Sequence, residues 1–256
     1  MERSIWSGTV SFGLVTIPVN LYGATRSNDV ALHQVHKTCG GRMRQLRWCP
    51  ECQAEISLDD LGKGWGVGKG ETIPLTDAEL AALPVPTAKT IQILGVVKAV
   101  DPLYMEKAYY LQPEAAGRKA YALFYRALAD KGVAAIGRFA LRTKETLVTV
   151  QARDGILALT TLYYADEVRL EHERYDDVAL TDTEMGLATM LVEAMGEADL
   201  RGQRDGYREA LLALVESKVA GLSPPKALPA GPNPIIGDLM ATLRESIEAA
   251  RKAKAA

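Results

Sequence analysis

The stretch ETLVTVQARDGILALTTLYY, residues 145–164, decides the fold class. Two strand-like runs, 145–152 and 156–164, alternate apolar and polar side chains over much of their length, a pattern typical of β-strands. They flank Asp154 and Gly155, and a glycine accepts the positive φ that a tight turn needs. The stretch therefore predicts a β-hairpin.

Further strand-like runs lie on the N-terminal side of this hairpin. The first, IWSGTVSFGLVTIPVNLY at 5–22, alternates apolar with small or polar side chains and is bent or interrupted by Gly13 and Pro18. The others are KTIQILGVVKAV at 89–100, LYMEKAYYL at 103–111 and AAIGRFALR at 134–142. Several strands at short spacing, with few helices between them, predict a mainly antiparallel β-barrel.

Helices are inserted among the strands, which argues against a doubly wound α/β fold. The sequences TDAE at 76–79 and TDTE at 181–184 each have the pattern of a capping box. The run 115–131 has one apolar face and is followed by a glycine, a common helix stop. Two further apolar repeats predict an all-helical arm over 179–222. The predicted fold class is mainly β with α: an antiparallel β-barrel core followed by a C-terminal helical arm.

A proline-rich linker and an amphipathic, basic C-terminal helix are predicted for residues 223–256. Five prolines between Gly221 and Pro234 forbid regular structure there. A tethered amphipathic helix is typically a docking element, although it can also pack back on its own domain. The candidate partner-binding residues form the apolar stripe of this helix: Leu239, Met240, Leu243 and Ile247.

The composition is that of a globular protein. The chain has 256 residues, 48% of them hydrophobic, which is enough to bury a sizeable core. The longest apolar runs are interrupted by glycine, proline or charge, and the first residues lack the regions of a signal peptide. We therefore expect no membrane association and a cytoplasmic location.

Charge is distributed unevenly along the chain, although the formal net charge is only −2. Residues 26–47 contain five basic residues and one acid, and residues 117–153 contain eight basic and two acidic residues. Residues 154–216 contain fifteen acids and five basic residues. This polarisation can steer a polyanion onto one face, whereas the alternative is ordinary solvated surface.

The two basic segments supply the candidate DNA contacts. Arg42 and Arg44 are two positions apart, so on a strand they project from the same face toward successive phosphates. Neither segment contains a base-reading helix, so we expect contacts to the DNA backbone that are indifferent to sequence. The candidates are Arg26, Lys37, Arg42, Arg44 and Arg47 in the first segment and Arg138, Arg142 and Lys144 in the second.

The three cysteines lie within 14 residues of one another. An odd, clustered set is a poor disulfide framework. With one histidine they form two close pairs, His36 with Cys39 and Cys49 with Cys52, and tetrahedral zinc accepts such ligands. A structural zinc site is one possibility, and metal-free cysteines are the other.

Signatures of catalysis are missing. The sequence has no Walker loop, GxGxxG, GxSxG, HExxH or nucleotidyl-transferase lysine motif. The glycine-rich run GKGWGVGKG at 62–70 lacks the Walker spacing and predicts a flexible loop. Adjacent acids such as Asp59 and Asp60 diverge on a strand and favour solvated surface. We expect a protein that is not an enzyme and requires no cofactor.

The opening block, IWSGTVSFGLVTIPV at 5–19, closely resembles the start of bacterial Ku proteins. Further blocks agree with this family in the same order along the chain. They are HQVHK at 33–37, GRMR at 41–44, TIQIL at 90–94, YADEVR at 164–169 and DLM at 238–240. The resemblance covers essentially the whole chain.

This resemblance implies a β-barrel core over 1–178 with an arch inserted near residues 30–90. Two such subunits would form a homodimeric ring through which duplex DNA threads. The implied role is to bind and protect double-stranded DNA ends in non-homologous end joining and to recruit DNA ligase D, at the nucleoid. By position, the arch would carry Lys37, Arg42, Arg44 and Arg47 on its DNA-facing surface.

Two departures from the family pattern and two alternative functions remain. Asn20 stands where many relatives have lysine, and Cys39 has no general equivalent, so zinc does not follow from the resemblance. A zinc-ribbon enzyme of nucleic-acid metabolism is one alternative, and a plain scaffold is the other. Both predict DNA binding that is absent or independent of a free end.

Overall fold

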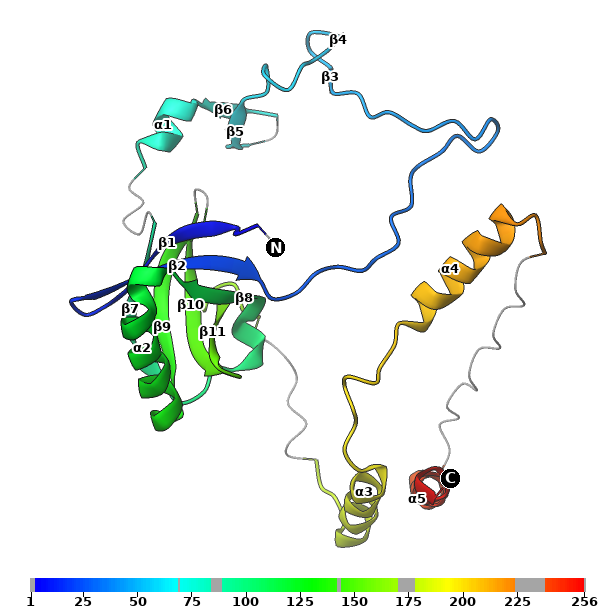
Figure 1. The fold of residues 1–256 in the computed structure, drawn as a ribbon. Helices are drawn as coiled ribbons and strands as arrows, with labels where there is room; N and C mark the ends of the chain where they lie inside the picture. Colours follow the sequence, from blue (N-terminus) through cyan, green and yellow to red (C-terminus); the bar gives the residue numbers. More distant parts are fainter. Residues whose placement is uncertain are drawn as a thin grey trace. The chain divides into compact units, whose positions relative to one another are not determined.

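The structure is a computed structural model that describes residues 3–68, 70–83, 89–141, 144–169, 178–223 and 238–255. It consists of two units, residues 1–28 with 33–170 and residues 29–32 with 171–256. Within the described residues, the first unit contains a closed β-barrel and the second contains helices (Figure 1).

The barrel strands lie in the spatial order β1-β2-β8-β11-β10-β9-β7. Their bounds are β1 Trp6–Phe12, β2 Val15–Gly23, β7 Thr90–Val97, β8 Met105–Pro113, β9 Ala134–Leu141, β10 Lys144–Arg153 and β11 Ile156–Leu162. The pair β1 and β7 is parallel, and the other neighbouring strands pair antiparallel. The predicted fold class is confirmed, with a mixed rather than purely antiparallel barrel.

Two tight hairpins shape the barrel. The predicted turn at Asp154 and Gly155 is confirmed, because β10 pairs with β11 and the two residues have φ of 48° and 84°, as a type I′ turn requires. The stretch 5–22, predicted as a strand that Gly13 and Pro18 bend or interrupt, is interrupted at Gly13 and forms the hairpin β1–β2, and Pro18 lies within β2. Its turn includes Gly13 at φ 60°, where a residue with a Cβ would be strained.

The core of the first unit lies inside the barrel. Trp6 meets Phe139 edge to face, with ring centroids 5.5 Å apart. Burying one large apolar side chain contributes about 1.5–3 kcal/mol, so the stability of this unit resides mainly here. The strand residues of the main core cluster are Val10, Ile17, Val19, Leu21, Ile91, Tyr109, Leu111, Ala135, Phe139, Val148, Val150, Leu157 and Leu159.

Helix α2 (Arg118–Lys131) packs against β2 and β10, after the short 3₁₀ helices η1 (Pro102–Tyr104) and η2 (Ala115–Gly117). Its buried residues are Tyr121, Phe124 and Leu128, all on the predicted apolar face. The helix ends at Gly132, which has φ 60° and supplies the left-handed C-terminal cap.

The Tyr121 hydroxyl joins two barrel strands. It donates to the carbonyl of Leu111 in β8 (2.6 Å) and accepts from the N–H of Leu157 in β11 (2.7 Å). Leu111 and Leu157 face each other in the ladder, so the hydroxyl bridges the backbones of paired residues. Burial raises the pKa of Tyr121 above its usual value.

The segment between β2 and β7 contains short elements: β3 Trp48–Cys49, β4 Ala54–Glu55, β5 Lys63–Gly66, β6 Thr72–Leu75 and α1 Asp77–Ala81. The prediction of a flexible loop over 62–70 is wrong for its first half, because β5 pairs with β6 and Trp65 lies opposite Ile73. A Cβ at Gly64 would collide with the Thr72 side chain, so glycine permits this close pairing. Helix α1 begins at the predicted capping box.

The second unit contains α3 (Asp182–Met195), α4 (Gly206–Val219) and α5 (Leu239–Ala255). Helix α3 begins at the predicted capping box, where hydrogen bonds from the Thr181 hydroxyl and N–H lower the pKa of Glu184. Most of the proline-rich linker, residues 224–237, lies outside the described residues. The boundaries at 178 and 222 stay predictions. No helix in the described ranges is long and apolar enough to cross a membrane.

Candidate nucleic-acid interface

The first basic segment follows β2 and has little regular structure. Its best-defined part is a turn in which the His36 N–H donates to Gly41 and the Gly40 N–H donates to His36, both at 2.8 Å. An isolated bridge pairs Val35 with Arg42, and Gly40 has φ 70°, a conformation that favours glycine. Residues 35–42 therefore form a small loop within an exposed segment that has little regular structure.

All five basic candidates of this segment are exposed. The Nη2 atom of Arg42 lies 3.3 Å from Nδ1 of His33, which holds this guanidinium near the loop. Exposed cations of this kind suit phosphate contacts, because neutralising a phosphate releases condensed counterions. The DNA-binding roles of Arg26, Lys37, Arg42, Arg44 and Arg47 stay predictions.

The second basic set differs, because its described members face carboxylates. In Arg138 of β9, Nη1 lies 3.4 Å from Glu145, and Nζ of Lys144 lies 3.7 Å from Glu167. Exposed ion pairs contribute only about 0–1 kcal/mol, so a phosphate can compete for these cations, although their field is partly neutralised. Arg142 lies outside the described residues. The roles of all three stay predictions.

The candidate zinc ligands form two separate pairs. Nδ1 of His36 lies 3.1 Å from Sγ of Cys39. Cys49 ends β3, and hydrogen bonds from the backbone and side chain of Cys52 lower its pKa. No three His, Cys, Asp or Glu side chains among the described residues converge as a metal site. A site with four ligands needs the two pairs to come together, and it stays a prediction.

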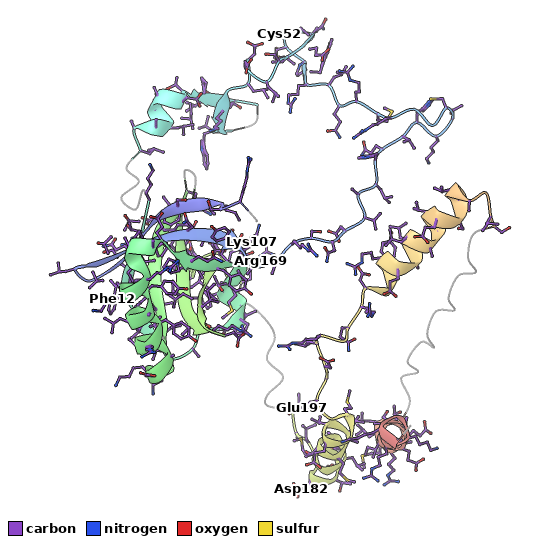
Figure 2. All side chains as sticks on the ribbon, viewed as in Figure 1. Phe12, Cys52, Lys107, Arg169, Asp182 and Glu197 are labelled. Atoms are coloured by element: carbon purple, nitrogen blue, oxygen red, sulfur yellow. The ribbon has the colours of Figure 1, made fainter. Side chains whose placement is uncertain are left out.

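Cys52 lies between β3 and β4 on the inserted segment, where Figure 2 labels it. Cys39 and Cys52 are exposed, and Cys49 is partly exposed. These thiols are therefore accessible to a metal or an oxidant, unlike the buried cysteines typical of a core.

The candidate partner-binding stripe on α5 contacts α3. Ile247 is buried, Met240 and Leu243 are partly buried, and Leu239 is 57% exposed. This contact favours the alternative of a packed helix over a free one. Partner binding by the stripe stays a prediction. Because α5 already contacts α3, a partner would have to bind through the exposed Leu239 or compete with α3.

Sequence reasoning missed a polar groove on the outer surface of the barrel. Its volume is about 560 Å³, and it is lined by Tyr22, Gly23, Ala24, Thr25, Arg26, Tyr110 and Gln112. Strand alternation was the available signal: Tyr22 and Tyr110 each follow or precede a leucine that points inward, so both tyrosines are expected to point outward. Their pairing across strands could not be read from the sequence.

The fold and this surface define a class: a β-barrel protein with an exposed basic segment inserted between two barrel strands. Residues 11–187 match the family described as the Ku70/Ku80 beta-barrel domain, which is most of the chain. The chain belongs to the Ku family.

Several curated proteins named "Non-homologous end joining protein Ku" are similar to this chain. The protein from Frankia casuarinae is 42% identical over 97% of this chain, and the one from Desulfitobacterium hafniense is 35% identical over 96%. The protein from Archaeoglobus fulgidus is 37% identical over 86%. The matched regions cover 64%, 87% and 89% of these relatives, respectively, so the chain spans just under two-thirds of the Frankia protein.

Proposed function

We propose that the chain binds the ends of double-stranded DNA in non-homologous end joining, without reading sequence and without catalysis. Membership of the Ku family, whose relatives carry non-homologous end joining in their names, is the observation that carries this proposal. The exposed basic residues from Arg26 to Arg47 support it, because fixed cations bind phosphates of any sequence. This role would place the protein at the nucleoid, in the cytoplasm.

The proposal includes a homodimeric ring that protects the end it encloses. A closed ring loads only where a duplex stops, which accounts for a preference for ends without any base recognition. The polarised charge of the chain fits this arrangement, since a basic lining attracts DNA while acidic surfaces repel it.

Comparing linear and covalently closed DNA tests the ring. The two substrates are one plasmid, either closed or cut once, so that sequence and length are matched. We expect tight, salt-sensitive binding to the linear form and much weaker binding to the closed form. Equal affinity for both forms contradicts the ring.

Recruitment of DNA ligase D through α5 is the second part of the proposal. Leu239 is the most exposed residue of the stripe and lies at the start of the helix, so it offers an apolar contact that α3 leaves accessible. Leu239→Asp should reduce stimulation of end joining by the ligase while leaving end binding intact. Lys252→Glu, on the same helix, is the matched control. Full stimulation by the Leu239 variant contradicts this assignment.

Zinc binding by His36, Cys39, Cys49 and Cys52 is a separate proposal. Its support is the presence of two close ligand pairs, each formed within a short turn. Elemental analysis should find about one zinc per chain, as four ligands make one tetrahedral site, and Cys49→Ser should release it. Metal-free protein with unchanged DNA binding makes the cysteines ordinary surface residues.

A further inference from the structure

Two tyrosines form an aromatic surface on the outside of the barrel. Tyr22 of β2 lies directly opposite Tyr110 of β8 in the antiparallel ladder. Their neighbours Leu21 and Leu111 are fully buried in the core, so the tyrosines point outward, and Tyr110 is 40% exposed. Directly opposed residues have Cβ atoms about 4.5–5.5 Å apart, so the two tyrosine side chains leave the sheet from adjacent positions.

The chain that leaves β2 forms one wall of a groove beside these rings. The N–H of Ala24 donates to the carbonyl of Ala108 at 3.1 Å, which extends the pairing with β8 beyond the end of β2. Arg26 follows and lines the same groove, as does Gln112 on β8. Figure 2 labels Lys107, which lies on the same strand as Tyr110.

The lining has a consistent chemistry. The seven residues of the groove include one cation, Arg26, and no carboxylate. The side chain of Gln112 offers both an amide donor and an acceptor. The volume of the groove, about 560 Å³, lies within the roughly 300–1,000 Å³ typical of small-molecule sites. The groove therefore suits an anion that carries a flat ring with hydrogen-bonding edges.

We propose that this groove binds an unpaired nucleotide of a single-stranded DNA overhang, an inference that rests on the proposed end-binding function. The tyrosine rings stack on the base, Arg26 contacts a phosphate, and Gln112 hydrogen-bonds the base edge. Bases inside a duplex are already stacked on both faces, so they cannot use an aromatic platform. An overhang therefore gains a contact that a blunt end lacks.

A proline-rich peptide is another ligand that aromatic grooves bind. The chain's own segment SPPKALPAGPNP, residues 223–234, has this composition. Its one charged residue is Lys226, which has the same charge as Arg26. The positive groove therefore favours the nucleotide over this peptide.

The test compares blunt and overhanging ends on the full chain. The probes are a labelled 30-bp duplex, the same duplex with a 3′ overhang of five thymidines, and that duplex with five abasic sites as the overhang. We expect the thymidine overhang to bind at least about fivefold more tightly than the blunt end, the lower range for one stacked base. The abasic overhang keeps its phosphates and the Arg26 contact but lacks the bases, so it should bind less tightly than the thymidine overhang.

Variants of the aromatic pair locate the effect. Tyr110→Ala and Tyr22→Ala should make the thymidine overhang bind like the abasic overhang and leave blunt-end affinity unchanged, because both rings lie outside the core. Tyr110→Phe should retain the preference, since stacking needs only the ring. Tyr207→Ala is the matched control, because Tyr207 is 75% exposed on α4.

Three results overturn the inference. They are equal binding of blunt and thymidine ends, equal binding of the thymidine and abasic overhangs, and a difference between these two overhangs that is unchanged in Tyr110→Ala. Displacement of the overhang by a 223–234 peptide, lost in Tyr110→Ala, would identify a peptide site and overturn it as well. Failure of the end-binding function has a different signature, because the blunt duplex itself would then not bind.

Discussion

The barrel and the segment inserted between β2 and β7 differ in strand pairing and in burial. Barrel strands pair on both sides and enclose a core whose central side chains have no solvent exposure. The inserted segment has two-stranded sheets of two and four residues per strand, and its tryptophans Trp48 and Trp65 are 61% and 69% exposed. Isolated two-stranded sheets are marginally stable in water. The free energy of folding of this unit therefore comes mainly from the barrel.

The candidate DNA contacts follow the opposite distribution. The inserted segment presents exposed arginines and lysine, whereas the described basic candidates of the barrel face carboxylates. A surface that binds phosphates gains from unpaired, hydrated cations, and such residues add little to a fold. The residues that stabilise the fold and the candidate DNA contacts are therefore different, so substitutions can separate the two.

The largest expected effect is in the barrel core. Phe139 is fully buried against Trp6, so Phe139→Ala leaves a cavity and should lower the free energy of unfolding by about 3–5 kcal/mol. Trp48→Ala removes a larger ring from the inserted segment and should change the same quantity by less than about 0.5 kcal/mol, as is usual for exposed sites. Urea unfolding followed by circular dichroism measures both. Similar losses for the two variants would contradict the conclusion that the barrel, and not the inserted segment, stabilises the fold.

An intermediate effect is expected at the hydroxyl that bridges β8 and β11. Tyr121→Phe leaves the Leu157 N–H and the Leu111 carbonyl without this partner and should lower the free energy of unfolding by about 1–3 kcal/mol. A loss near zero would mean that the two strands pair fully without the hydroxyl.

Tyr121 also predicts a pH dependence. Its pKa in the folded protein is raised above the unfolded value of about 10, so its contribution is complete below that pH and is lost as pH rises through the folded pKa. The free energy of unfolding should therefore fall less steeply above pH 10 in Tyr121→Phe than in the unaltered protein. Parallel alkaline profiles would contradict a buried, hydrogen-bonded hydroxyl.

The smallest effect on stability is expected for Arg42→Ala combined with Arg44→Ala. Both side chains are exposed, so the free energy of unfolding should change by less than about 0.5 kcal/mol per site. DNA affinity should fall about equally for all sequences, and the slope of log affinity against log salt should decrease by roughly one unit per lost phosphate contact. Altered sequence preference would mean that these residues read bases.

Local sequence was sufficient for features that depend on neighbouring residues. The Asp154-Gly155 turn, the two capping boxes and the apolar face of α2 follow from φ preferences, short hydrogen bonds and helical spacing. The same rules failed at 62–70, where glycine-rich composition suggested a loop. The strand β5 exists there because β6 supplies its partner, and that information lies outside the stretch.

The sequence by itself determined the barrel class, the helix starts and the family, because these depend on short-range periodicity and on blocks that keep their order. Only the tertiary structure decided which distant residues meet. It placed Tyr22 beside Tyr110, gave Arg138 the carboxylate of Glu145 and laid α5 on α3. Strand register and helix packing are set by the whole core, and one chain segment carries no record of the partner it will face.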